Sequence, residues 1–514
     1  MGTITEINKQ DAENGLDRSN GELEALKKSP VAVSRLARLL FFAFLGACVW
    51  HCLIELFSTT AGSHSMVAML TTSLSQAIKL GLAAIVVTSP TAAADATACD
   101  FNIYEHMGNL SPYFQPSNTP PSLSSGAPPG CAVTKGFLVH RHGSRNPLSD
   151  EIGTIQNLAY YIGNESSLFS APRAPVPDAL AFLEKGWNST FTTNDLSATG
   201  RQQLFDHGVA MRLKYPQLSA SRVLAGDQDR VVESARWFMD GYYGRSANSS
   251  ASLDLIAEDN KTVSWITPMD TCEKWTYGFG GALVSEWGKT YLPPIADRLN
   301  HLLADSFPSV NFTTAHVHGM LYACVYGTAV YGKDSSLWCP VFTRAEILDH
   351  EYEYDLLMRG AFGYGLPGDM GPVLGSLLVS NMTEFLLKQD KEGQDNLSLN
   401  FGHDTTLDLL LSALHLAQDS HFPATGPVDP DRAWRTARQV PFAAQMLFRG
   451  LDCEGGEKRI QLLLNEANFD LSPSGCESDD YGTCKMSDFT ASETVKAALA
   501  VRHGDARWQS VCSA

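Results

Sequence analysis

The chain contains 514 residues and carries a formal net charge of −18 at pH 7. A chain of this length is too long for one simple core, so we expect one large domain with an insertion, or two domains. The acidic balance argues against a nucleic-acid-binding protein, because such proteins need a basic face. A site for an anionic substrate would therefore have to concentrate positive charge locally.

The first 98 residues differ in character from the rest. Residues 1–34 are polar and lack a periodic apolar face, which predicts a disordered N-terminus. Residues 35–57 are mostly apolar and long enough to span a bilayer, and nearby Lys and Arg residues would keep the N-terminus in the cytosol. We expect a transmembrane or signal-anchor helix here, with a cleaved signal segment as the alternative. Residues 58–98 are expected to be a linker with an apolar patch but no second span, which would return the rest of the chain to the cytosol.

Sequons and cysteines beyond this segment favour a secretory lumen. Nine of the 11 cysteines lie between Cys99 and Cys512. Since no pair of them has zinc-finger spacing, we expect disulfides, and because nine is an odd number at least one thiol is left over. We therefore expect a type II membrane protein with a lumenal or extracellular domain, or a protein secreted after N-terminal cleavage. The eight candidate glycosylation sites all follow residue 99: Asn109, Asn164, Asn188, Asn248, Asn260, Asn311, Asn381 and Asn396.

From residue 99 onward, segments typical of strands and helices alternate. The expected strands are 132–140, 222–226 and a stretch that ends at His403. The expected helices that follow them are 196–213, 231–243 and 407–416. This alternation predicts an α/β fold with a largely parallel central sheet flanked by helices.

Polar residues stand at the ends of these three strands. They are Arg141, His142 and Arg145 after the first, Arg230 after the second, and His403 with Asp404 after the third. In open α/β sheets the carboxyl ends of the strands face the ligand crevice, so these residues can converge from distant parts of the chain. Guanidinium groups offer forked donors to phosphate oxygens, and an imidazole nitrogen can attack phosphorus.

With these residues in view, the chain resembles the histidine acid phosphatases, most closely the secreted fungal acid phosphatase and phytase branch. Residues 141–147 match the family's R-H-G-x-R-x-P motif in full, and His403-Asp404 match its H-D motif. The resemblance covers roughly 99–514. It implies a phosphoglycerate-mutase-like α/β core of about 99–245 and 395–514, with a mostly helical insertion of about 246–394.

The resemblance also implies a mechanism. His142 would attack phosphorus and form a phosphohistidine, and Asp404 would protonate the leaving group and then activate water. Arg141, Arg145 and Arg230, with His403, would hold the phosphate oxygens. The arginines should lower the pKa of His142, whereas Asp404 needs a raised pKa or an acidic medium in order to donate. No cofactor or metal is needed, and no metal-ligand cluster is visible in the sequence.

The family's cysteine frame implies four disulfides and leaves Cys99 over. The pairs are Cys131 with Cys453, Cys272 with Cys512, Cys324 with Cys339, and Cys476 with Cys484.

Two further histidines resemble catalytic residues by position alone. His140 adjoins the motif, but we expect strand alternation to turn it away from His142, so that its role is structural. Arg502-His503-Gly504 lacks the second arginine and the proline of the motif, and we interpret it as a chance match.

The substrate is expected to be a small phosphomonoester. Residues 148–172, which follow the first motif, contain no Lys or Arg, and phytate with its six phosphates would favour a basic loop there. We therefore favour a broad-specificity acid phosphatase, with phytase as the alternative. A non-catalytic, membrane-anchored phosphate-binding protein is a further alternative, which the complete catalytic set disfavours. Eight sequons and the cysteines make a cytosolic phosphomutase a poor explanation.

Overall fold

The computed structural model describes residues 101–389 and 393–513. The expected disordered N-terminus, the membrane segment 35–57, the linker 58–98 and Cys99 lie outside these residues, as does the side chain of Asn248.

Eight strands of the described chain form one sheet with β1 at its centre. The order is β3-β2-β4-β1-β5-β6-β7, and β8 pairs with β6. Phe137, Leu138 and Val139 of β1 are all buried, as a strand covered by helices on both faces requires. The strands are β1 (Cys131–Arg141), β2 (Arg222–Gly226), β3 (Ser252–Ile256), β4 (Leu397–Gly402), β5 (Gln445–Cys453), β6 (Lys458–Leu464), β7 (Ala467–Phe469) and β8 (Cys484–Lys485).

The two halves of the sheet differ in strand direction. The pairs β1–β4, β2–β4 and β2–β3 are parallel, whereas β5 pairs antiparallel with β1, and β6 to β8 continue in antiparallel pairs. The predicted α/β class is confirmed, but the sheet is mixed, and the expectation of a largely parallel sheet holds only for the first half. The reason is local: β6 and β7 are joined through Asn465 and Glu466, both at positive φ, and so short a link closes only an antiparallel pair.

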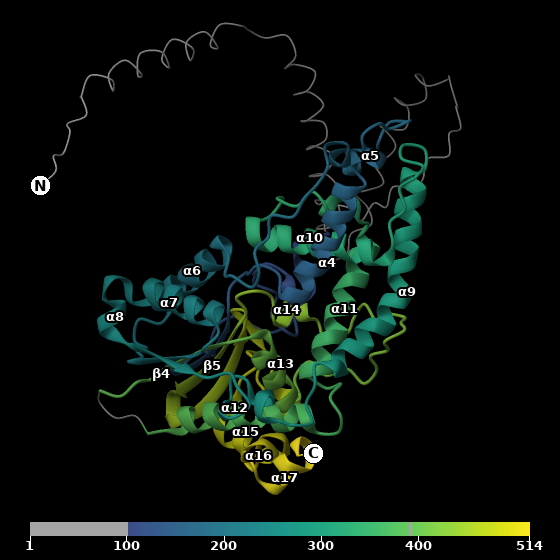
Figure 1. Cartoon of the computed structure of the whole chain (residues 1–514). Helices are drawn as coiled ribbons and strands as arrows, with labels where there is room; N and C mark the ends of the chain where they lie inside the picture. Colours follow the sequence, from purple (N-terminus) through teal and green to yellow (C-terminus); the bar gives the residue numbers. More distant parts are fainter. Residues whose placement is uncertain (1–100, 390–392, 514) are drawn as a thin grey trace, which may run out of the picture. The chain divides into compact units, whose positions relative to one another are not determined.

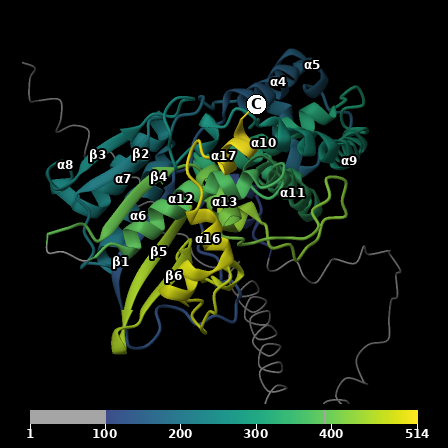
Figure 2. The same ribbon diagram turned by 90° about the horizontal axis from the view of Figure 1, so that it is seen from below.

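Helices cover both faces of this sheet (Figure 1, Figure 2). The helices α6 and α7 pack on the face that contains Leu138 and Val223, and α12 and α13 pack on the opposite face against Phe137 and Val139. Their bounds are α6 (Ala198–Lys214), α7 (Asp229–Tyr243), α12 (Met370–Leu387) and α13 (Asp404–Ala413). The C-terminal part and the segment after α7 add short helices: α8 (Ala247–Ser250), α14 (Thr436–Gln439), α15 (Met486–Ala491), α16 (Glu493–Leu499) and α17 (Ala506–Cys512).

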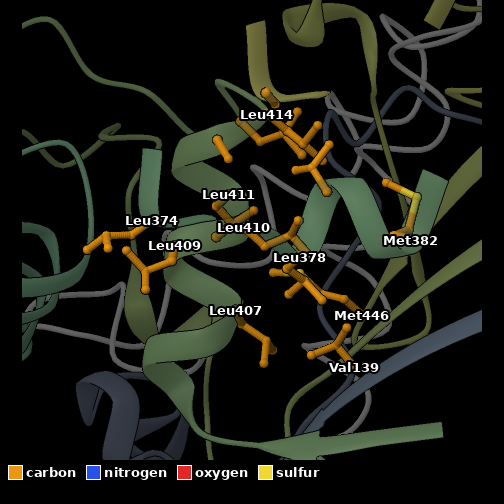
Figure 3. Packing of buried hydrophobic residues seen from close by; sticks show 14 of the residues in the cluster. Val139, Leu374, Leu378, Met382, Leu407, Leu409, Leu410, Leu411, Leu414 and Met446 are labelled. Carbon is orange, nitrogen blue, oxygen red and sulfur yellow. The ribbon is translucent and has the colours of Figure 1, made fainter. Parts of the chain in front are cut away.

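Figure 3 shows the core between α12, α13 and the sheet. Side chains of α13, such as Leu407 and Leu410, lie with Leu378 of α12 and with Val139 and Met446 of the central strands. Among the described residues, α12 is the one helix long and apolar enough to cross a membrane, but 67% of it is buried. Its apolar composition is explained by this core.

A second group of helices forms a core of its own beside the sheet. It consists of α4 (Ser149–Asn164), α5 (Ser166–Phe169), α9 (Gly278–Leu303), α10 (Thr314–Tyr331) and α11 (Arg344–Phe362). This helical group does not coincide with the expected insertion of about 246–394. Leu158 of α4 packs in this group although α4 precedes the insertion, whereas β3 and α12 fall inside it and belong to the sheet and its cover.

The four expected disulfides are all present. Cys131–Cys453 joins the paired ends of β1 and β5, and Cys272–Cys512 ties α17 to the segment before α9. Each of these long-range links contributes about 2–5 kcal/mol to stability.

The sequons separate into exposed and engaged asparagines. Asn164, Asn188, Asn260 and Asn311 are exposed. The Nδ2 atoms of Asn381 and Asn396, to which a glycan would be attached, donate instead to the carbonyls of Leu377 and Gln217. Asn109 is buried with an exposed fraction of 6%, and the expectation of a glycan there is wrong because its Nδ2 donates to Asp404.

Candidate active site

The predicted polar residues converge at one edge of the sheet. The strands β2, β4 and β1 are parallel neighbours, so their carboxyl ends carry Arg230, His403 and His142 to the same place. The amide of His142 donates to the Gly402 carbonyl at 3.0 Å, and the rings of His142 and His403 lie 5.6 Å apart. They border a pocket of about 240 Å³ that also reaches Asp404, Arg145 and Arg230.

The turn after β1 requires glycine because the backbone of α6 passes close to it. A Cβ on Gly143 would lie 2.5 Å from the carbonyl oxygen of Gly200, and a Cβ on Gly200 would lie 2.2 Å from that of Ser144. The amide of Gly143 donates to the Oγ of Ser234 on α7 at 3.1 Å. These contacts press the motif against both helices and fix the direction of the His142 side chain.

His142 is held as a neutral imidazole with one free nitrogen. It is 2% exposed, and its Nδ1 lies 2.9 Å from the Gly143 carbonyl, which can only accept, so Nδ1 carries the proton. The lone pair is therefore on Nε2. Burial, followed by the charges of Arg230 and Arg141, holds the pKa of His142 well below its ordinary value. The predicted effect of the arginines is confirmed in direction, with burial as the larger cause.

The arginine cluster, Arg141, Arg145 and Arg230, keeps several donors without a protein partner. Arg141 is fixed through Nη1 by the carbonyls of Asn109 and Val440. The Nε atoms of all three are buried and have no hydrogen-bond partner among the described residues. Burial lowers the pKa of Arg141 and of Arg230 to about 10, so both stay cationic in acid. Such fixed, unpaired donors suit a tetrahedral oxyanion.

Glu258, just after β3, is a site residue that sequence reasoning missed. Both its carboxylate oxygens lie within 3.0 Å of His403 Nε2, and Gln228 donates to it at 2.6 Å. A Cβ on Gly226 would meet its Oε1 at 1.9 Å, so the glycine makes room for it. Since a carboxylate accepts, Nε2 of His403 carries a proton, and Nδ1 faces Nη2 of Arg230 at 3.5 Å. No motif marks Glu258, because the turn around it, residues 257–261, has no pattern that predicts a functional site.

Asp404 is the N-terminal residue of α13 and is bound from two sides. Its Oδ2 accepts from Nδ2 of Asn109 at 2.7 Å and lies 2.9 Å from Nη2 of Arg141. Burial raises the pKa of Asp404, but Arg141 and the Asn109 hydrogen bond outweigh it and leave the pKa below its ordinary value. We expect Asp404 to need either a raised pKa or an acidic medium in order to donate a proton. Because its pKa is lowered, only the acidic medium can supply the protonated form. Asn109 was recognised in the sequence only as a sequon.

His140 and His503, the two histidines that resemble catalytic residues by position alone, do not line the pocket. His140 is fully buried, its Nε2 lies 3.0 Å from His207 Nδ1, and its ring stacks on Phe401. His140 has the structural role that we expect, but strand alternation is not the reason, because residues two apart in a strand share a face. The two side chains separate because β1 ends at Arg141 and the chain turns before His142. His503 is exposed and packs its ring 4.7 Å from Trp508.

The rest of the pocket presents acidic, aromatic and apolar groups. We call this surface the acidic wall. Apart from His142 and His403, the basic side chains among the described lining residues are Arg145 and Arg230, and no lysine is among them. Glu151 is partly neutralised by Arg145 at 3.3 Å, whereas Asp270 lies in the pocket without an ion pair to any residue that the structure describes. The acidic wall consists of Leu148, Glu151, Met269, Asp270, Tyr277, Tyr354, Leu357, Met358 and Phe362.

Comparisons with known proteins bear on this geometry. A family model described as histidine phosphatase superfamily (branch 2) matches residues 133–465. The chain is 27% identical to a thiamine-repressible acid phosphatase of Schizosaccharomyces pombe, over 84% of this chain and 96% of that relative. It is 26% identical to phytase A of Arthroderma benhamiae, over 75% of this chain and 88% of that relative.

Solved structures show the same fold. A phytase from D. castellii superposes with a TM-score of 0.68 at 23% identity, over 82% of this chain and 90% of that one. A multiple inositol polyphosphate phosphatase from Bifidobacterium longum superposes with a TM-score of 0.53 at 14% identity, over 76% of this chain and 97% of that one.

Proposed function

Because the chain belongs to the histidine phosphatase superfamily (branch 2), we propose that it is an acid phosphatase that hydrolyses small phosphate monoesters through a phosphohistidine, without a metal cofactor. The observation that carries the proposal is the free Nε2 of a neutral His142 beside the unpartnered donors of the arginine cluster. The first supplies a nucleophile and the second supplies charge stabilisation.

In the first half of the proposed reaction, the Nε2 lone pair of His142 forms the nitrogen–phosphorus bond. The bond from phosphorus to the ester oxygen breaks, and the departing oxygen takes the proton of Asp404, which yields the alcohol. The arginine cluster holds the other phosphate oxygens while negative charge shifts between them. His403 would face the phosphate through Nδ1 while its Nε2 remains bound to Glu258.

In the second half, water attacks the phosphorus of the phosphohistidine. Asp404, now a carboxylate, takes a proton from that water, and the electrons of the nitrogen–phosphorus bond return to His142 Nε2. Inorganic phosphate leaves, and the enzyme regains its starting protonation. Asp404 thus acts as acid and then as base at one position.

The lowered pKa of Asp404 supports activity in acid. The protonated carboxyl becomes more abundant as the pH falls, while His142 stays neutral because its own pKa is also lowered. A phosphate dianion bound among the arginines would also reduce the positive field on Asp404 and favour its protonated form.

The acidic wall supports a monophosphate substrate over phytate. A hexaphosphate bound by one phosphate would place its other phosphates against Asp270, Glu151 and neutral side chains, with no lysine to receive them. An aromatic or aliphatic alcohol would instead pack on Tyr277, Tyr354 and Met358. Phytase remains the second candidate, because relatives of comparable identity are named phytases.

The test is phosphate release by the purified protein at about pH 3 to 6, with an aryl phosphate and with phytate, beside His142→Ala. We expect release from the aryl phosphate, less from phytate, and none above background in the variant. A preference for phytate would favour the second candidate. A folded wild-type protein that releases phosphate from neither substrate would instead support the phosphate-binding protein.

We also propose that the catalytic domain is a glycoprotein of the secretory pathway, held to a membrane by residues 35–57 or released by cleavage. The four disulfides and the exposed Asn164, Asn188, Asn260 and Asn311 support this location. Endoglycosidase should lower the apparent mass, and protease added to intact microsomes should spare the domain. A domain that is digested in intact microsomes and carries no glycan would contradict the proposal.

A further inference from the structure

We propose that His318, His350 and Glu353 form a binding site for a divalent transition-metal ion such as Zn²⁺, away from the arginine cluster. One ligand atom of each residue lies within 4.8 Å of the others. His350 and Glu353 are three residues apart on α11 and so share a face, and His318 reaches them from α10. No metal-ligand cluster was visible in the sequence, because the third ligand stands on another helix.

Tyr291 of α9 orients two of the three ligands. Its hydroxyl donates to Oε2 of Glu353 at 2.6 Å, so the proton in its 3.2 Å contact with His350 must come from Nδ1 of His350. This arrangement leaves Oε1 of Glu353 and Nε2 of His350 as the atoms available to a metal. Metal-binding histidines usually donate their second nitrogen to such a partner, which fixes the tautomer.

The free nitrogen of His350 is the observation that points to a ligand. His350 is 1% exposed, and its Nε2 has no hydrogen-bond partner among the described residues. A buried acceptor without a donor is unfavourable, and a metal ion would satisfy it. His318 Nε2 lies 2.8 Å from Oε1 of Glu353. For Nε2 to become a third ligand, the neutral ring would lose its Nε2 proton to solvent and take up one on Nδ1.

The donor set indicates the class of ion. Two imidazoles and one carboxylate suit Zn²⁺ with a fourth position for water, whereas Mg²⁺ and Ca²⁺ prefer oxygen ligands. His318 is partly exposed and provides a route from solvent. The glutamate charge offsets part of the charge of the ion.

Such an ion would connect α9, α10 and α11 behind the acidic wall. Tyr354, the residue after Glu353, and Tyr277, immediately before α9, both line the pocket. Binding to the folded state alone should raise the thermal midpoint with metal concentration. The ion would thus stabilise the pocket wall without taking part in phosphoryl transfer.

The test uses Co²⁺ as a spectroscopic probe, added to the metal-free full-length protein near pH 7. We compare wild type with His318→Gln, Glu353→Gln and Tyr291→Phe, and with His301→Gln, which removes an exposed histidine of α9, as the matched control. Circular dichroism confirms that each variant is folded. The readouts are stoichiometry, affinity, the Co²⁺ absorption bands and the shift in thermal midpoint with Zn²⁺.

We expect one Co²⁺ per chain in wild type and in His301→Gln, with the intense bands of a low-coordinate site. Loss of an outer partner costs roughly 10–100-fold in metal affinity, so Tyr291→Phe should fall in that range and the two ligand variants should lose more. Equal, weak binding by wild type and His318→Gln would overturn the proposal and leave a hydrogen-bonded network without an ion. Tight binding by all variants would overturn it as well, because the ion would then sit elsewhere.

Discussion

The two sides of the candidate active site differ in the charge that they present to a substrate. The strand ends contribute the arginine cluster, of which Arg145 and Arg230 line the pocket and whose buried Nε atoms have no hydrogen-bond partner among the described residues. The acidic wall offers carboxylates, tyrosines and apolar side chains. In the proposed reaction a phosphate group would be recognised by charge, while the alcohol that carries it would meet a surface with little positive charge. The phosphoryl chemistry and the choice of ester would then depend on separate elements of this fold.

The largest effect is expected at the nucleophile. His142→Ala removes the only atom that we assign to attack on phosphorus, so steady-state phosphate release should fall by at least about 1,000-fold. His503→Ala is the matched control, since it removes a histidine from the look-alike Arg502-His503-Gly504 and should leave activity unchanged. Comparable losses in both variants would contradict the assignment.

The next effect concerns proton donation by Asp404. Asp404→Asn should lower kcat by roughly 100- to 10,000-fold for an alkyl phosphate, as expected for loss of a general acid. The loss should be smaller for a nitrophenyl ester, whose leaving group needs less protonation. In wild type, kcat/KM should rise as the pH falls, because the pKa of Asp404 is lowered and its acid form appears only in acid. Equal losses for both esters would show that Asp404 acts mainly by binding Arg141.

A moderate effect is expected at Glu258, which we interpret as a positioning residue for His403. Glu258→Gln should lower kcat by roughly 10-fold, as expected for one weakened charged hydrogen bond, and should change KM less. It should also shift the pH profile of kcat. Gly226→Ala should act in the same direction, because its Cβ would displace the Glu258 carboxylate. Asp270→Asn is the comparison, because this pocket carboxylate interacts with the charge of His403 but makes no hydrogen bond to it among the described residues; the same pH shift there would indicate a general charge effect.

The smallest effect tests the acidic wall directly. Asp270→Lys should raise the ratio of phytate to aryl phosphate turnover by roughly 5-fold, since partly exposed charge pairs contribute up to about 1 kcal/mol. The change should shrink in high salt. Asp431→Lys, which makes the same charge change outside the pocket, should leave the ratio unaltered, and a ratio that rises equally in both variants would indicate attraction by overall charge.

Most of the residues at the strand-end side of the candidate site could be predicted from the sequence. The motif of residues 141–147, Arg230 and the His403-Asp404 pair each followed a recognisable apolar strand, and parallel strands bring such ends together. The acidic wall was anticipated only from the missing Lys and Arg in 148–172. Its other members come from residues 269–270, Tyr277 and the helix α11, whose approach no local pattern encodes.

The predictions that differ from the structure depended on contacts between segments that are distant in the sequence. The antiparallel half of the sheet follows from tight hairpins after β5, and α4 joined the helical group because its apolar stripe packs on α10. Asn109 matches a sequon, yet only the folded chain shows its amide against Asp404.

The residues at the strand ends and the α/β class could be predicted from neighbouring residues in the sequence, and the cysteine pairs from the family resemblance. The tertiary structure alone decided the tautomer of His142, the contact of Glu258 with His403, and the meeting of His318 with His350 and Glu353. These depend on which backbone atoms and side chains become neighbours after burial, and burial sets the direction of hydrogen bonds and the protonation of the groups that make them.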